Sequence, residues 1–194
     1  SDDISLTNIN RQIHALETTI GQKKTLMMKE RILSINPQAK VTTIEKLYTP
    51  ESNFFNWDDN YTYIVDAVDD VKAKINLIVN ANKHNLPIMS SMGTANKLDP
   101  QKFVITDIYK THTCPLARIM RKTLKQQGIK KLKVLYSTEE PFTNYTVNFK
   151  ENTSKDNSPA STRKQPLGSI SFVPPIAGLM IAGEIVKDIC QINR

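Results

Sequence analysis

The stretch that decides the fold is YTYIVDAVDDVKAKINLIVNANKHNLPIMSS, residues 61–91. Its first six residues are mostly β-branched or aromatic, which is typical of a buried parallel strand. Apolar residues then recur at helical spacing over 71–83, and a second apolar run covers 86–91. This strand–helix–strand order predicts an α/β fold built on a mostly parallel sheet.

The flanking sequence extends this pattern in both directions. Before the central unit, the spacing predicts a turn and short helix over 8–16, a helix over 22–34 and a strand over 39–48. After it, we expect mixed strands over 103–109 and 132–136, a helix over 115–127 that begins at proline and ends before glycine, and a final helix over 175–189. Residues 152–165 are polar and predict a mobile loop.

Composition limits the class of protein. With 194 residues, 39% hydrophobic and 23% charged, the chain is expected to form one globular domain. Two cysteines, Cys114 and Cys190, cannot build a disulfide framework or a four-cysteine zinc site, so a cytoplasmic location without zinc is predicted. The apolar run over 170–189 contains prolines and charged residues, so it indicates a buried helix and not a membrane span.

The net charge of +7 is concentrated in one window. Residues 108–138 contain no acidic residue but eight basic ones: Lys110, Arg118, Arg121, Lys122, Lys125, Lys130, Lys131 and Lys133. A localised basic surface suggests a polyanion larger than a nucleotide, and nucleic acid is the first candidate. A solvated helix face is the alternative.

Four residues suit a nucleotide site. Arg11 offers a planar fork to phosphate, Asn8 can donate to a phosphate oxygen, and Lys24 opens a predicted helix, where anions are stabilised. Asp69 follows the strand over 61–66, at the sheet edge where ligands bind and where a carboxylate can hold Mg²⁺. Taken singly, Arg11 and Lys24 could be surface cations, and Asp69 could cap the following helix.

The order of these motifs, Asn-x-x-Arg-Gln, Gly-x-x-Lys and Val-Asp-x-x-Asp, resembles the ubiquitin-activating-type adenylating enzymes, the superfamily of ThiF, MoeB and HesA. The resemblance implies a Rossmann-like fold in which Asn8, Arg11 and Lys24 bind the phosphates of ATP and Asp69 binds Mg²⁺. Arg11, Lys24 and Asp69 are then the catalytic residues.

Runs such as TNINRQIHAL (7–16), PLAR (115–118) and the stretch 168–178 are similar to one branch, the tRNA threonylcarbamoyladenosine dehydratases. This resemblance implies cyclisation of N6-threonylcarbamoyladenosine at position 37 of tRNA through a carboxyl-adenylate. It also implies a homodimer and, as in some relatives, a sulfurtransferase or desulfurase partner.

The expected single domain then divides into a nucleotide part, 1–93, and a part for tRNA and dimer contacts, 94–194, with a mobile loop over 139–167. Lys110, Arg118, Arg121, Lys122 and Lys125 are expected to contact tRNA.

The sequence departs from that family in two places. Its six glycines form no Gly-x-Gly-x-x-Gly, so we expect the first strand and phosphate loop of the fold to precede Ser1, and the chain alone to bind ATP poorly and to be inactive. Cys114 stands where the family usually has Asp, as a bystander or as a nucleophile.

Two alternative functions stay open. One is an adenylating enzyme for a ubiquitin-like sulfur carrier, which the absence of zinc-binding cysteine pairs and the basic window disfavour. The other is a non-catalytic nucleic-acid-binding remnant, which Arg11, Lys24 and Asp69 disfavour because a remnant does not need phosphate and metal ligands.

Overall fold

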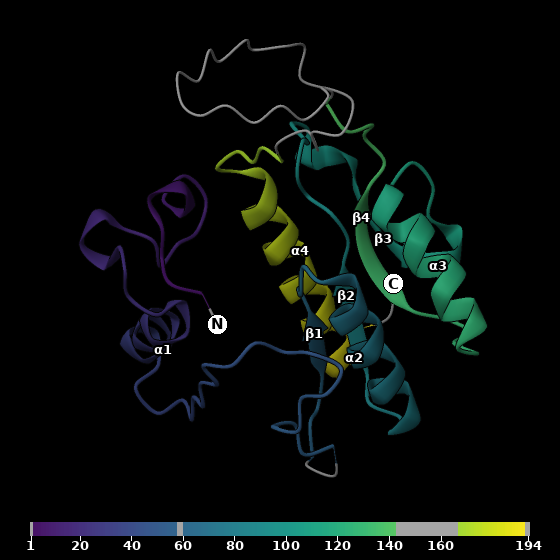
Figure 1. Cartoon of the computed structure of the whole chain (residues 1–194), viewed down its shortest axis with the longest axis horizontal. Coiled ribbons are helices and arrows are strands. Elements are labelled where there is room, and N and C mark those ends of the chain that lie inside the picture. The colour runs from purple at the N-terminus through teal and green to yellow at the C-terminus, as the bar shows by residue number, and fades with distance from the viewer. Residues whose placement is uncertain (1, 58–59, 143–166, 193–194) are drawn as a thin grey trace, which may run out of the picture.

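Four short strands form one mixed sheet: β1 (Ile64–Asp66), β2 (Ile88–Ser91), β3 (Phe103–Asp107) and β4 (Lys133–Ser137). Their order is β1-β2-β4-β3, in which β1, β2 and β4 run parallel and β3 lies antiparallel to β4 (Figure 1). The structure is a computed structural model, and it describes residues 2–57, 60–142 and 167–192. The predicted α/β fold with a mostly parallel sheet is therefore confirmed.

Helices cover both faces of this sheet. On one face lie α2 (Val71–Lys83) and α3 (Pro115–Gln126), and on the other lies α4 (Val173–Ile189) (Figure 1). Alternation along β4 creates the two cores, because Val134 and Tyr136 point to the α2/α3 face whereas Leu135 points to α4. The three-layer arrangement buries each helix along one stripe, as with Val173, Ala177 and Ile181 of α4.

Helix boundaries follow the predicted signals closely. Helix α3 begins with Pro115 in its first turn and is followed by Gly128, which takes the left-handed φ of +75° that glycine adopts without strain. The predicted helix over 22–34 is α1 (Lys24–Ile35), and the final helix begins two residues earlier than expected. The predicted loop over 152–165 lies outside the described residues.

The predicted strand over 39–48 is wrong. These residues take irregular structure, and within the described chain β1 hydrogen-bonds only to β2, so no strand pairs with its other edge. A lone extended segment has no ladder to satisfy its backbone groups. Instead, the end of this segment packs through Tyr48, whose hydroxyl donates to Asn76 Oδ1 of α2 at 2.8 Å and whose ring contacts Phe54 and Phe55 edge-on.

The N-terminal segment, residues 2–35, lies beside the sheet and not within it (Figure 1). It contains two short 3₁₀ turns, η1 (Leu6–Asn8) and η2 (Glu17–Thr19), and α1, none of whose residues is buried. The short helix expected within 8–16 is thus replaced by turns on either side of that stretch. No helix in the described ranges is long and apolar enough to cross a membrane.

Candidate nucleotide site

Asn8 and Arg11 share one turn of the N-terminal segment. The Arg11 N–H donates to the Asn8 carbonyl at 3.1 Å, and the Asn8 side-chain oxygen accepts the Ser5 N–H at 3.1 Å. One guanidinium nitrogen of Arg11, Nη1, donates at 2.8 Å to both the Thr7 carbonyl and Asn10 Oδ1. The segment itself therefore fixes the direction of the Arg11 side chain, and the Asn8 amide group is left as a donor.

A hydrogen-bond relay ties this turn to the sheet. Asn10 Nδ2 donates to the Ser169 carbonyl at 3.0 Å, just before α4. The neighbouring Gly168 N–H donates to Asn96 Oδ1 at 2.7 Å, and the Asn96 N–H donates back to the Gly168 carbonyl at 2.9 Å. Asn96 lies in the loop after β2, so the relay joins the turn that contains Arg11 to a loop at the carboxyl edge of the parallel strands. That edge is where α/β sheets bind ligands.

Lys24 occupies the first position of α1, which begins two residues later than the predicted start at 22. Its Nζ lies 3.2 Å from Asp2 Oδ2, while the preceding Lys23 pairs with Asp3 at 2.6 Å. The carboxylate of Asp2 is 75% exposed, and exposed ion pairs contribute little free energy. Lys24 can therefore exchange Asp2 for a phosphate group without a large cost in stability.

His14 lies close to Lys24 and has no hydrogen-bond partner for either ring nitrogen within the described residues. Burial of the ring and the nearby charge of Lys24 lower the pKa of His14 below its ordinary value of 6.5. The imidazole is therefore neutral at pH 7, and the positive charge of this region comes from Arg11 and Lys24.

Asp69 follows β1 in the turn that leads into α2, and its side chain is exposed. It does not cap the helix: Asp70 occupies the N-cap, where its Oδ1 accepts the Ala73 N–H at 2.8 Å. The alternative in which Asp69 caps α2 is therefore wrong. In the described part of the chain no hydrogen bond or ion pair joins Asp69 to Asn8, Arg11 or Lys24, so the phosphate residues and the carboxylate form two separate groups.

The sequence analysis missed a buried polar network behind Asp69. Lys74 Nζ lies 2.7 Å from Asp66 Oδ2 and 3.2 Å from Ser90 Oγ, and Ser90 donates to the same carboxylate oxygen at 2.5 Å. All three side chains are almost completely buried. A signal for it was available, because Lys74 falls on the apolar stripe of α2 with Leu77, Ile78 and Ala81.

Most of the predicted nucleic-acid residues lie exposed. Lys110 follows β3, and Arg118, Lys122 and Lys125 lie on α3 at spacings of four and three residues, which places them on one face. Arg121 differs, because its Nη1 donates at 2.9 Å to the Thr111 carbonyl and also bonds the Thr111 hydroxyl. Arg121 thus holds the loop before α3 as well as adding charge.

Cys114 occupies the position before α3 and is only 6% exposed. The nearby Lys97 is also buried, and this burial lowers its pKa even though Glu139 opposes the effect. A buried thiol is poorly placed to meet a macromolecular substrate, which favours the bystander interpretation of Cys114.

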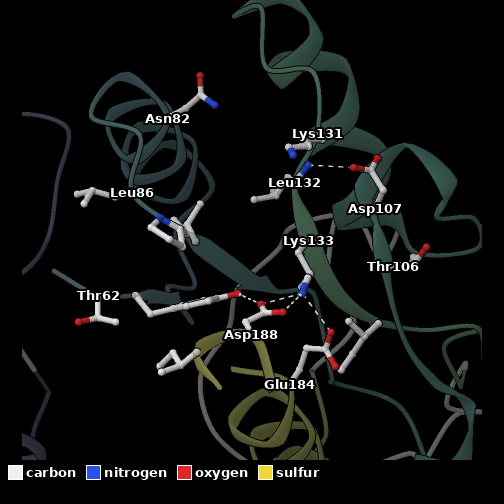
Figure 2. A pocket seen from close by; sticks show the side chains of 15 residues that line it. Thr62, Asn82, Leu86, Thr106, Asp107, Lys131, Leu132, Lys133, Glu184 and Asp188 are labelled. Carbon is white, nitrogen blue, oxygen red and sulfur yellow. Dashed lines mark hydrogen bonds and ion pairs between the residues drawn. The ribbon is translucent and has the colours of Figure 1, made fainter. Parts of the chain in front are cut away.

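A cavity of about 780 Å³ opens at the other end of the sheet, between the amino ends of the parallel strands and the end of α4 (Figure 2). There Lys133 contacts Asp188 at 2.6 Å and Glu184 at 3.1 Å, and the Tyr63 hydroxyl donates to Asp188 at 2.7 Å. Burial, followed by the bond to Asp188, raises the pKa of Tyr63. Asn8, Arg11, Lys24 and Asp69 do not line this cavity, so it is distinct from the predicted nucleotide site.

A mixed, mostly parallel sheet with helices on both faces defines an α/β domain of the Rossmann-like type. The chain belongs to the ThiF family, whose profile matches residues 1–194.

Two relatives illustrate what the chain is similar to. The chain is 41% identical, over 98% of its length and 75% of the relative's, to the tRNA threonylcarbamoyladenosine dehydratase of Bacillus subtilis strain 168. It is 38% identical to the enzyme of that name from Escherichia coli strain K12, over 64% of this chain and 46% of the other.

Solved structures show the same likeness. The E. coli tRNA N6-threonylcarbamoyladenosine dehydratase TcdA in complex with AMP matches with a TM-score of 0.79 and 27% identity, over 98% of this chain and 73% of that one. The same enzyme in complex with ATP matches with a TM-score of 0.74 and 26% identity, over 99% and 75%.

Proposed function

We propose that this protein dehydrates N6-threonylcarbamoyladenosine at position 37 of tRNA, using ATP to activate the carboxylate of the modified base. The observation that carries the proposal is the 41% identity, over nearly the whole chain, to a relative of that name. The likeness to TcdA structures in complex with AMP and with ATP supports the use of ATP.

The reaction has two steps. A carboxylate oxygen of the threonyl group attacks the α-phosphorus of ATP, and pyrophosphate leaves. The ureido nitrogen of the same nucleoside then attacks the activated carbonyl carbon, loses its proton and expels AMP, so the nucleoside loses one water overall. The substrate supplies its own nucleophile, so the protein contributes positioning and charge stabilisation and needs no covalent intermediate.

Arg11 and Lys24 have the chemistry that the first step requires. Negative charge accumulates on the phosphate oxygens as the carboxylate approaches and pyrophosphate departs. Arg11, oriented by the Thr7 carbonyl and Asn10, would present its remaining guanidinium N–H groups to these oxygens. Lys24 would add a second cation at the start of α1, where the helix dipole also favours an anion.

Asp69 fits a role as ligand to Mg²⁺. Its carboxylate is exposed and makes no hydrogen bond or ion pair within the described residues. Mg²⁺ is usually bound by one or two carboxylates together with substrate phosphates, so a single carboxylate can serve as its protein ligand. A bound ion would neutralise charge on the phosphate chain as pyrophosphate leaves.

The exposed cations of α3 are suited to bind the tRNA backbone. Arg118, Lys122 and Lys125 share one helix face, and no acidic side chain lies within residues 108–138 to neutralise them. Phosphate contacts of this kind supply affinity without sequence readout. Recognition of the modified base would then depend on the nucleotide site itself.

The outer face of α4 supports a homodimer. Leu179 is 72% exposed and Val186 56%, and they lie with Ala182 and Pro175 at spacings of three and four residues along one side of the helix. The charged residues of α4 lie elsewhere, because Glu184 and Asp188 face Lys133, and Lys187 pairs with Glu184 at 3.5 Å. An uncharged apolar stripe matches the requirement of a self-complementary interface.

The proposal is tested with protein produced from its complete gene. The protein is incubated with ATP, Mg²⁺ and tRNA that carries the modified base, after which the RNA is digested and the nucleoside is weighed. We expect the nucleoside mass to fall by one water, and Arg11→Ala to abolish this loss. Arg31→Ala, an exposed arginine of α1, is the matched control and should retain activity.

The sulfur-carrier alternative gives a different result in the same assay. An unchanged nucleoside, together with ATP–pyrophosphate exchange that requires a carrier protein ending in Gly-Gly, would reject the dehydratase function.

A further inference from the structure

The buried network of Asp66, Lys74 and Ser90 lies directly behind the exposed carboxylate of Asp69. Asp66 is the last residue of β1 and pairs in register with Ser90 of β2, while Lys74 reaches them from the second turn of α2. A strand end, its neighbour and the following helix are therefore joined at one carboxylate. The three side chains have relative exposures of 0%, 1% and 0%.

The two oxygens of the Asp66 carboxylate have different partners. Lys74 and Ser90 both hold Oδ2, at 2.7 and 2.5 Å. This leaves Oδ1 to accept the Val68 N–H at 3.1 Å, in the type of turn that Asp side chains form with the backbone two residues later. The ammonium group thus orients a carboxylate that in turn fixes the backbone immediately before Asp69.

The residue after Asp69 is held by the same elements. Asp70 caps α2 through the Ala73 N–H, and its carbonyl accepts the Lys74 N–H at 2.9 Å. Asp69 therefore lies between two anchored neighbours, while its own side chain is free of protein partners in the described chain. Pre-organisation of this kind aims a metal ligand without constraining the ligand itself.

Stability alone is a weak explanation for such a network. Desolvation of two buried charges offsets much of their attraction, so apolar residues of similar size often stabilise a fold equally well. The position of the network, at a turn that presents an exposed carboxylate after the carboxyl end of β1, indicates a positional role.

We infer that Lys74 is a positioning residue: through Asp66 it fixes the turn that presents Asp69 to the metal of the metal–nucleotide complex. This inference rests on the proposed role of Asp69. Ser90 acts with Lys74, since it holds the same oxygen from the neighbouring strand.

The experiment uses protein from the complete gene and measures binding of the Mn²⁺–ATP complex through the Mn²⁺ paramagnetic resonance signal, alongside the melting temperature Tm. We expect Lys74→Met to weaken binding about tenfold or more, as loss of a supporting group behind a metal ligand does. Leu124→Ala, a fully buried residue on α3 remote from Asp69, is the control for loss of stability.

Lys74→Met leaves the Asp66 charge buried without a partner and could prevent folding, so a milder pair accompanies it. Ser90→Ala removes one of the two anchors of Oδ2 and should weaken binding by about threefold to tenfold, the value of one hydrogen bond. Ser91→Ala, on the same strand, removes a hydroxyl whose one hydrogen bond among the described residues goes to the Met92 carbonyl, and it should have no effect on binding.

The outcomes separate the inference from the proposed function. The inference is overturned if Lys74→Met and Ser90→Ala bind Mn²⁺–ATP as tightly as their controls while Asp69→Ala binds weakly. If Asp69→Ala itself binds normally, the proposed metal ligand is wrong and the inference falls with it. If the network were purely structural, Lys74→Met would have a lower Tm but would bind Mn²⁺–ATP with the same dissociation constant as Leu124→Ala.

Discussion

The N-terminal segment and the sheet carry the two halves of the candidate site in opposite ways. Residues 2–35 hold a half-buried Arg11 on a turn outside the sheet, and Lys24 on a helix without a buried residue. Asp69 stands on a turn backed by a fully buried ion pair and two strands. Substitution of Arg11 or Lys24 should therefore change the chemistry with little effect on stability, whereas substitutions in the buried network beneath Asp69 should change both. The following predictions test that contrast, from the largest expected effect to the smallest.

Leu124→Ala should cause the largest loss of stability. Leu124 is fully buried between α3 and the sheet, and removing a buried leucine side chain costs about 2–5 kcal/mol through lost contacts and the cavity left behind. Urea denaturation would measure the change in the free energy of unfolding. Activity per folded molecule should stay at the wild-type value, and a loss of activity beyond the unfolded fraction would contradict the separation of core and site.

Lys24→Ala should lower kcat/KM for tRNA dehydration by about a hundredfold, because it removes a cation that stabilises developing phosphate charge. The Tm should change little, since the Asp2 pair that is lost is exposed. Lys23→Ala is the matched control: it is adjacent and pairs with Asp3 at 2.6 Å. If Lys24→Ala and Lys23→Ala had equal activity, the assignment of Lys24 to the nucleotide site would be wrong.

Asp70→Ala and Asp69→Ala form a pair of neighbours with opposite expected effects. Loss of the Asp70 cap should lower the free energy of unfolding by about 1 kcal/mol. Asp69→Ala should leave that free energy unchanged and raise the Mg²⁺ concentration needed for half-maximal rate. Thermal unfolding measures the first effect, and a Mg²⁺ titration of the rate measures the second. If Asp69→Ala lowered stability and Asp70→Ala raised the Mg²⁺ requirement, the roles of helix cap and metal ligand would be reversed.

The ion-pair cluster at the cavity predicts a small pH effect. The hydrogen bond from Lys133 outweighs the effect of burial and lowers the pKa of Asp188 below its ordinary value of 3.8. The ionised carboxylate therefore adds to the free energy of unfolding above pH 3.8, and this stabilisation is lost as the pH falls through the lower pKa of the folded state. Between about pH 5 and about pH 3, the free energy of unfolding should fall further for the wild-type protein than for Asp188→Asn. The difference between the two decreases should be about 1 kcal/mol or less. Urea denaturation measures both free energies, and an equal decrease in the two proteins would contradict this prediction.

The sequence predicted the parts of the molecule whose signals are local. Periodicity placed α2 at its observed bounds, and proline and glycine marked the ends of α3. The strand predicted over 39–48 failed because a strand also needs a partner, which alternation within one segment cannot reveal. Likewise, the Asp66–Lys74 pair joins residues eight positions apart through a buried contact, which only the packing of α2 on β1 creates. Asp69 and Arg11 were selected by motif, and their roles stay predictions.

Asn96 has a further consequence for how this chain can vary in length. Its carbonyl accepts the Phe142 N–H at 2.8 Å, and its side chain and N–H bond Gly168, so the residues on either side of 143–166 meet at one asparagine. A connection whose two ends are already joined can be lengthened at a closure cost that grows only logarithmically, about 0.6 kcal/mol for each doubling. The described residues therefore hold the two ends of this connection together by themselves, and a change in its length should leave Asn96 and its two partners in place.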